Sequence, residues 1–166
     1  MNILYAVLYA AILGLVSHFV GQLLPRRWFH PDRFPFRTWK WERDGSVYRH
    51  LGIQYWKDLV PDMSKIMPDM VPKRVHSQET AEETTILIQE TCVAEAVHVV
   101  LMVLAIGIVL ICPNSWGVSI ALFDALILNL PFILIQRYNR PKLLRLEEKL
   151  RRKEEKKLHE ISDSYV

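Results

Sequence analysis

The sequence predicts an all-α integral membrane protein with three transmembrane helices, an aromatic-rich cytoplasmic interfacial segment and a C-terminal amphipathic helix. Two observations support this prediction. All 21 lysine and arginine residues fall within 26–74 and 137–157, so residues 1–25 and 75–136 contain none. These two regions contain apolar runs long enough to cross a bilayer, whereas the helices of a soluble domain carry a polar face.

Composition excludes several classes of protein. A chain of 166 residues is expected to form one domain, here a single membrane domain over residues 1–166. A net charge of +3 does not indicate a nucleic-acid partner. Cys92 and Cys112 are about 30 Å apart if the run between them is helical, so a disulfide is excluded and both are expected to be buried hydrophobic groups. The chain contains no phosphate-binding loop, dinucleotide fingerprint or serine nucleophile elbow.

The three spans follow from the apolar runs. Residues 3–24 have no formal charge and form the first. This run lacks the basic start and the cleavage site of a signal peptide, so we expect a retained helix. Residues 93–112 and 116–135 form the second and third spans, and only residues 113–115 separate them, which indicates a tight helical hairpin.

Residues 25–90 form the predicted interfacial segment. Nine of the 17 aromatic residues fall between Trp28 and Trp56. Tryptophan and tyrosine prefer the headgroup level of a bilayer, so we expect short segments on the membrane surface. Pro61, Pro68 and Pro72 interrupt the next part of the chain. The N-cap of the second long helix is expected at Ser77 or Thr80, the latter forming a capping box with Glu83.

Residues 136–166 form the predicted cytoplasmic tail. Asn139-Arg140-Pro141 predicts that a separate helix starts there. Leu143, Leu146 and Leu150 share one face of it, and the pairs Glu147–Arg151 and Glu148–Arg152 stand in the favourable i,i+4 order. An amphipathic helix of this kind lies on the membrane surface or in solvent.

The basic residues predict the orientation. They follow the first and third spans and are absent from the N-terminus and from the 113–115 turn. Since lysine and arginine collect on the cytoplasmic side, the N-terminus is expected outside and the C-terminus inside the cell.

Several polar residues lie inside the spans, where they are costly and indicate function. His18, His98 and Asn129 are each expected about 9–10 Å below the cytoplasmic surface, so their helices can form a pocket at one depth. Glu95 shares a face with His98, and Gln136 shares a face with Asn129. Asp124 lies about 140° from Asn129 around an α-helix and has no assigned role.

The pattern leaves two alternatives open. In the first, His98 is a general base that Glu95 orients. In the second, the polar residues hold three helices together. No metal-ligand spacing is present, so we expect no metal site.

Three stretches of the chain resemble the glycosyl-4,4′-diaponeurosporenoate acyltransferase family of small bacterial membrane proteins. The first contains Asn129-Leu130-Pro131 and then Ile135-Gln136-Arg137-Tyr138-Asn139-Arg140-Pro141 with Leu143. The second contains Glu90-Thr91, Glu95 and His98, and the third contains Tyr55-Trp56-Lys57, Leu59 and Pro61. The resemblance implies a bacterial cell-membrane enzyme that esterifies an acyl group to the C6 hydroxyl of a glucose carried by a carotenoid acid.

The resemblance suggests roles for the residues already identified. His98 is the expected base, with Glu95 positioning it, and Asn129 or Gln136 is expected to donate a hydrogen bond to the oxyanion. Arg137 and Arg140 are expected to bind donor phosphates, or else to serve as topology signals that contact lipid headgroups. Trp56 and Lys57 are expected to form a platform for sugar or acyl chain. The remaining residues assigned to substrate binding are His18, Glu90 and Asn139.

The expected partners are the bilayer, a glycolipid acceptor and an acyl donor. Acyl-CoA or another acyl thioester is expected as the co-substrate, without a cofactor. A homo-oligomer or a complex with other pathway enzymes is also compatible with the sequence. A rival hypothesis is a non-enzymatic membrane scaffold for a lipid or carotenoid biosynthetic complex, in which the polar residues serve only for helix packing.

Overall fold

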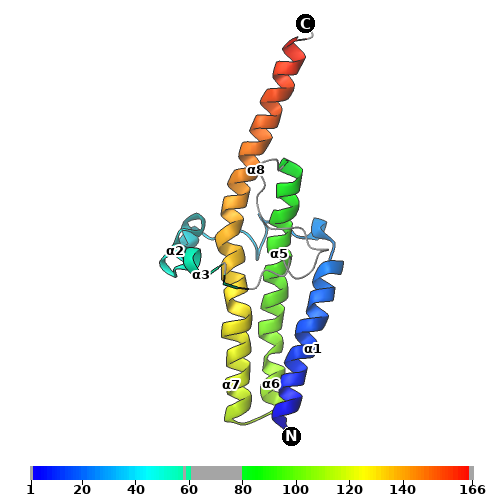
Figure 1. Ribbon diagram of the computed structural model, residues 1–166, viewed down its shortest axis with the longest axis vertical. Helices are drawn as coiled ribbons and strands as arrows, with labels where there is room; N and C mark the ends of the chain where they lie inside the picture. The colour runs from blue at the N-terminus through cyan, green and yellow to red at the C-terminus, as the bar shows by residue number, and fades with distance from the viewer. Residues whose placement is uncertain (1, 58, 61–79, 165–166) are drawn as a thin grey trace.

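A computed structural model describes residues 2–57, 59–60 and 80–164 (Figure 1). Helices make up the regular structure of these residues, and no strand occurs among them. The predicted breaks at Pro61, Pro68 and Pro72 and the alternative cap at Ser77 lie outside the described residues.

Three long helical rods lie side by side (Figure 1). The first is α1 (Asn2–Leu23), and the second is α5 (Ala81–Leu104) continued by α6 (Ile106–Ile111). The third consists of α7 (Ser115–Phe123), a π-helical turn η3 (Asp124–Asn129) and α8 (Leu130–Ser164). Each rod contains a stretch long and apolar enough to cross a membrane, which confirms the prediction of three such helices.

The second rod begins where the capping box predicts. The Thr80 hydroxyl accepts a hydrogen bond from the Glu83 backbone N–H at 3.2 Å, and the Glu83 carboxylate accepts from the Thr80 N–H at 2.9 Å. These two bonds satisfy N–H groups that a helix start leaves open.

The hairpin between α6 and α7 is tight for a specific reason. The Asn114 side chain caps α7 by accepting from the N–H groups of Trp116 at 3.0 Å and Gly117 at 3.2 Å. A Cβ atom at Gly117 would lie 1.8 Å from the carbonyl oxygen of Cys112, so only glycine fits. Cys112 and Cys92 are both buried and unbridged, as expected.

Helix α1 packs on the second rod at both of its ends. Near the hairpin, the Tyr9 hydroxyl donates to the Leu104 carbonyl at 3.1 Å, and its ring fills the space beside Gly107. At the opposite end, Arg26 in η1 (Arg26–Trp28) forms an ion pair of 2.6 Å with Glu90 of α5. The two attachments fix the position of α1 along the second rod.

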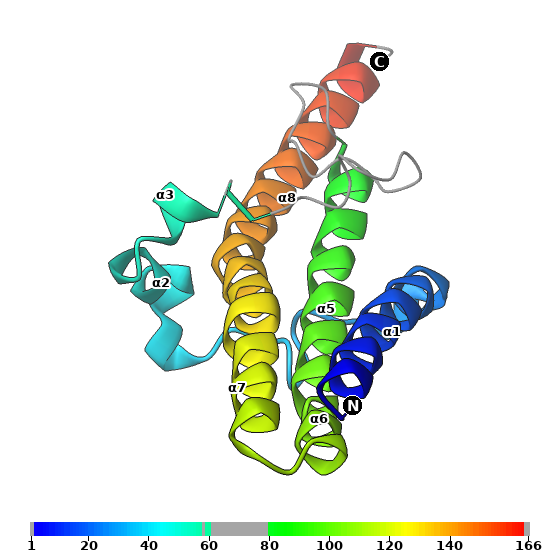
Figure 2. The same ribbon diagram turned by 60° about the horizontal axis from the view of Figure 1, so that its bottom comes forward.

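The described part of the interfacial segment contains short helical turns: η1, η2 (Lys40–Gly45), α2 (Val47–His50) and α3 (Ile53–Trp56). Figures 1 and 2 place α2 and α3 beside α8, on the side away from α1. Gly45 has a φ of +82°, and a Cβ there would lie 3.3 Å from the Tyr138 carbonyl. This close approach holds the segment against α8.

The predicted helix start at Asn139-Arg140-Pro141 is wrong. Helix α8 passes through Pro141 without a break. Proline there lacks the N–H that would bond to the Arg137 carbonyl. Contacts made by the same turn offset this loss, since Arg137 and Arg140 both bond to neighbouring segments and Pro141 is buried. Tertiary contacts therefore override the local preference for a helix boundary at Pro141.

The tail of α8 carries both predicted i,i+4 ion pairs. Arg151 lies 2.7 Å from Glu147, and Arg152 lies 2.5 Å from Glu148. Glu147 also accepts a hydrogen bond of 2.6 Å from Thr85, so the first part of the tail packs on α5. Beyond residue 150 the described side chains are exposed.

Candidate active site

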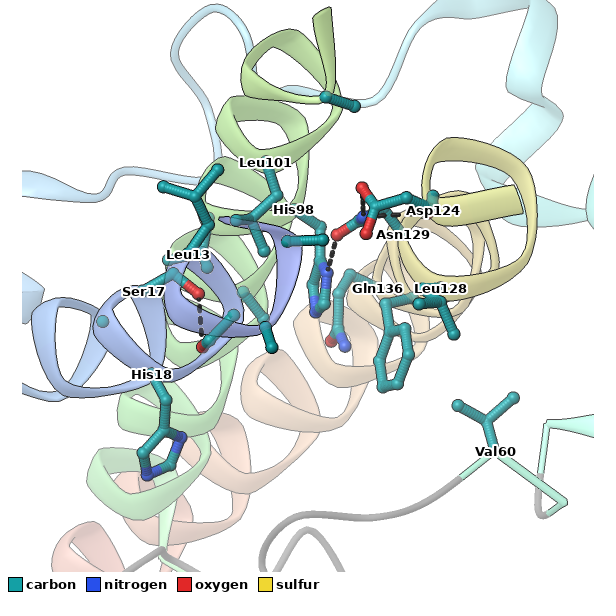
Figure 3. Close-up of a pocket in the computed structure, with 18 of the residues that line it drawn as sticks. Leu13, Ser17, His18, Val60, His98, Leu101, Asp124, Leu128, Asn129 and Gln136 are labelled. Carbon is teal, nitrogen blue, oxygen red and sulfur yellow. Dashed lines mark hydrogen bonds between the residues drawn. The ribbon is translucent and has the colours of Figure 1, made fainter. Parts of the chain in front are cut away.

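A cavity of about 1150 Å³ lies between α1, the second rod and the third rod. It brings His18, His98 and Asn129 to one space, as their common depth in the sequence predicts. Figure 3 shows His98 and Asn129 next to each other, joined by a hydrogen bond, and His18 apart from them on α1. Glu90, Gln136, Asn139 and Lys57 also line the cavity.

His98 forms a hydrogen bond with Asn129, from Nδ1 to Oδ1 at 2.9 Å (Figure 3). The Asn129 Nδ2 donates to the backbone oxygen of Asp124 at 2.9 Å and to its carboxylate at 3.0 Å. The imidazole also stacks on Phe132, with ring centroids 4.4 Å apart and 12° between the planes. His98 is therefore held by an aromatic face and by a polar chain that ends in a carboxylate.

The π-helical turn makes this chain possible. In a regular α-helix, Asp124 and Asn129 would point in directions about 140° apart. Residues 124–129 instead form a π-helix, in which five positions complete roughly one turn. Asp124 therefore faces Asn129. Sequence reasoning missed this role because the angle was calculated for an unbroken α-helix.

The chain of bonds also assigns the proton on His98. The Asn129 NH₂ group donates to Asp124, so the amide oxygen faces the imidazole. An amide oxygen only accepts, so Nδ1 of His98 carries the hydrogen of this bond, and in the neutral imidazole Nε2 then has the lone pair. This is the tautomer that a general base acting through Nε2 requires.

Glu95 makes different contacts from those expected. One of its carboxylate oxygens lies 2.7 Å from Arg137 and the other 2.5 Å from Arg140. Glu95 is 3% exposed and Arg140 is 1% exposed. The expected orientation of His98 by Glu95 is therefore corrected: Asn129 takes the place next to Nδ1, and two arginines of α8 hold Glu95.

Glu42 completes the buried ionic cluster, and sequence reasoning missed it. Arg137 bonds Glu42 at 2.8 Å, and Glu42 also accepts from the Tyr48 hydroxyl. Burial and the neighbouring Glu42 carboxylate raise the pKa of Tyr48 well above its ordinary value, so this hydroxyl stays protonated. The available signal was that Glu42 is one of only two acidic residues, with Asp32, between Arg26 and Arg43.

The two arginines are not placed to receive phosphates. Arg140 donates to Thr91 Oγ1 at 2.8 Å and to the Phe36 carbonyl at 2.6 Å, besides Glu95. Arg137 donates to the Pro35 carbonyl at 2.7 Å, besides its two carboxylates. The expectation that they bind a donor's phosphates is therefore corrected, because these donors are used to fasten the interfacial segment to α5 and α8.

The other predicted residues line the cavity or the groove next to it. Glu90 is paired with Arg26, and His18 lies within 3.1 Å of Gln22, Nε2 to Nε2. Trp56 lines a smaller neighbouring groove, while Lys57 reaches the main cavity. Among the described residues, no group of three or more His, Cys, Asp or Glu side chains forms a metal site.

Comparisons with known proteins agree on one family. Residues 25–149 match a family model described as glycosyl-4,4′-diaponeurosporenoate acyltransferase. Proteins of that name from Staphylococcus aureus strains MRSA252 and Newman are 26% and 28% identical to this chain over 151 residues. In both cases the match covers 90% of this chain and 90% of the relative. No solved structure matches the chain.

Proposed function

The chain belongs to the glycosyl-4,4′-diaponeurosporenoate acyltransferase family, and from this premise we propose which groups it joins and where. It is an acyltransferase with three helices long and apolar enough to span a membrane. The proposed reaction transfers a fatty acyl group from an acyl thioester, such as acyl-CoA, to the C6 hydroxyl of glucose on a glycosylated carotenoid or related glycolipid. No cofactor takes part in this scheme.

The observation that carries the proposal is the bonded chain Asp124–Asn129–His98 on the wall of the cavity. In the proposed step, His98 Nε2 takes the proton of the sugar hydroxyl while that oxygen attacks the thioester carbonyl. The carbon–sulfur bond then breaks, and the imidazolium returns the proton to the departing thiolate. The ester forms without a covalent enzyme intermediate.

The developing oxyanion needs a hydrogen-bond donor, and Gln136 is our candidate. It lines the cavity and is 3% exposed. Asn129 is less suited to this role, because its NH₂ group already donates to Asp124. Asn129 is instead proposed to position His98.

The polar end of the cavity suits the sugar. Gln22, Gln136 and Asn139 line it together with the paired Arg26 and Glu90.

The positions of the basic residues favour an orientation in which this polar end of the cavity faces the cytoplasm and the N-terminus lies outside the cell. In the same arrangement, the aromatic segment 28–56 lies at the inner headgroup level, and the α8 tail extends from it as an amphipathic helix.

The test is a defined reaction followed by mass spectrometry. Purified protein in lipid nanodiscs receives palmitoyl-CoA and a glucosylated carotenoid acid. The expected product is heavier by one palmitoyl group, and the 6-deoxyglucosyl acceptor yields none. The variant His98→Ala is expected to lose about 10²–10⁴-fold in rate. His159→Ala is the matched control, since that histidine lies on the exposed tail.

Two results contradict the proposal. Product formed equally well from the 6-deoxy acceptor would remove the C6 assignment. A folded His98→Ala protein with the wild-type rate would remove the general base. A scaffold without turnover would give no product from any acceptor and would show the same inactivity in every variant.

A further inference from the structure

From His98 toward the hairpin between α6 and α7, the cavity continues as an apolar arm between the helices. Its wall there is formed by Val7, Ala10, Leu101, Ala105, Ile108 and Ile120. Two serines also line the cavity, but each uses its hydroxyl within its own helix. Ser17 donates to the Gly14 carbonyl at 2.9 Å and Ser119 to the Ser115 carbonyl at 2.9 Å. The arm therefore offers hydrocarbon surface with little competition from polar groups.

A packed cluster lies at the hairpin end of this arm. Ala6, Ala105, Ile108 and Cys112 are each no more than 4% exposed and form one apolar core between α1 and the hairpin. Ile120 and Ala121 of α7 pack against the same core. The hydrogen bond from Tyr9 to Leu104 fixes α1 at this level. We call this packed cluster the floor of the arm.

We propose that this arm holds the acyl chain of the donor and that its floor limits the chain length accepted. The inference rests on the proposed function, which places the reacting carbonyl at His98. From His98 to Ile108 is ten residues, or about 15 Å along a helix. The other direction from His98 leads to Arg26, Glu90 and Gln136, whose polar groups disfavour a hydrocarbon chain. The chain therefore runs toward the floor.

A second apolar groove offers the acceptor's hydrocarbon a separate path. The groove has a volume of about 530 Å³ and shares Leu128 and Phe132 with the main cavity. Leu59 and Ile127 line it and are 81% and 57% exposed, so it is open along the side of the molecule. A long, rigid polyene needs an open path of this kind. The two paths meet at Phe132, which stacks on His98.

Gly14 provides the first test of the proposal. It lines the cavity on α1, and a Cβ built there meets no atom within 4 Å. Gly14→Leu therefore adds side-chain volume at the arm, and its Cβ meets no existing atom. The kcat/KM ratio for sixteen-carbon over ten-carbon acyl-CoA is expected to fall by at least about tenfold, since one methylene in an apolar pocket changes discrimination by about 10–200-fold. Leu15→Phe is the control, because Leu15 is 60% exposed and does not line the cavity.

The outcomes separate the two proposals. No turnover by the wild type with any acyl-CoA would contradict the proposed function. Wild-type turnover with the same chain-length profile in Gly14→Leu would overturn the assignment of this arm. If Gly14→Leu instead raises KM for the glycosyl carotenoid alone, the arm holds the acceptor's polyene and the assignment is again overturned.

A photolabelling experiment tests the position of the chain without turnover. Palmitoyl-CoA with a diazirine at its terminal carbon is irradiated with the wild-type protein in nanodiscs, and labelled peptides are sequenced. We expect label on peptides containing Ala105, Ile108 or Ile120, and we expect unlabelled palmitoyl-CoA to compete it away. Label confined to the Ile127–Phe132 groove, or label displaced by the glycosyl carotenoid alone, would overturn the proposal.

Discussion

The side-chain amide of Asn129 donates a hydrogen bond of 3.0 Å to the carboxylate of Asp124, five residues earlier in the chain. The π-helical turn that spans these two residues places them on one face of the third rod. Single π-helical turns are frequent at functional sites in other proteins. Here the turn links a carboxylate, through an amide, to the imidazole of His98.

Replacement of Asp124 tests this link. Asp124→Asn removes the charge that holds the Asn129 amide, so we expect kcat to fall by about tenfold or more with little change in KM. The same substitution in an Asn129→Ala background is expected to have no further effect, because Asp124 acts through Asn129. Steady-state rates of the four proteins measure the coupling. Fully additive losses in rate would show that Asp124 does not act through Asn129. Asp32→Asn serves as the control, because Asp32 is exposed.

Glu95 is expected to matter for stability more than for chemistry. Glu95→Gln leaves the arginines of α8 without their shared buried carboxylate, and breaking a buried ion pair costs about 3–5 kcal/mol. Thermal unfolding in detergent is therefore expected to shift to a lower Tm, while the folded fraction keeps most of its activity. Glu148→Gln is the matched control, because its ion pair is exposed and worth little. Wild-type stability with lost activity in Glu95→Gln would restore the catalytic role predicted from sequence.

Gly45 is expected to be required for the attachment of the interfacial segment. Its φ of +82° costs other residues about 1–2 kcal/mol, and an added Cβ would lie 3.3 Å from the Tyr138 carbonyl. Gly45→Ala is therefore expected to lower the Tm and to increase proteolysis between Arg33 and Arg49. Gly14→Ala, in open space on a helix, is the control and is expected to leave the Tm unchanged or raise it. Equal Tm values for the two variants would contradict this account.

The contact between Tyr9 and Gly107 is expected to control the docking of α1. A Cβ at position 107 would lie 2.4 Å from the Tyr9 hydroxyl oxygen, so Gly107→Ala must displace the ring. We expect a lower Tm for Gly107→Ala, with recovery of part of the loss when it is combined with Tyr9→Ala. If the second substitution only adds to the loss, the two residues are not coupled. Cross-linking of a cysteine pair placed across α1 and α6 provides an independent measure of docking.

Local features of the chain could be predicted from the sequence with success. The Thr80–Glu83 capping box and the ion pairs of the tail depend on residues three or four positions apart, and the structure confirms them. The spans depend on runs of apolar residues, which need no knowledge of the fold. The single domain stays a prediction, as do the roles assigned to His98 and to the site residues other than Glu95, Arg137 and Arg140.

The helix start predicted at Asn139-Arg140-Pro141 failed for the opposite reason. It reports a local preference of a few kcal/mol at most. Arg137 and Arg140, on the same turn, bond to α5 and to the interfacial segment, and these partners are far away in sequence. Helix α8 continues because the distant contacts outweigh the local one.

By itself, the sequence predicted three helices long and apolar enough to cross a membrane, and it placed His18, His98 and Asn129 at a common level, because hydropathy and helical rise are local properties. It left open whether the polar residues form a site or a packing contact. The tertiary structure separates these residues in space: Glu95 pairs with Arg137 and Arg140, while His98 lines the cavity and bonds to Asn129. Only the fold decided this division, because the pairing partners come from distant segments and a π-helical turn changes the direction in which Asp124 points.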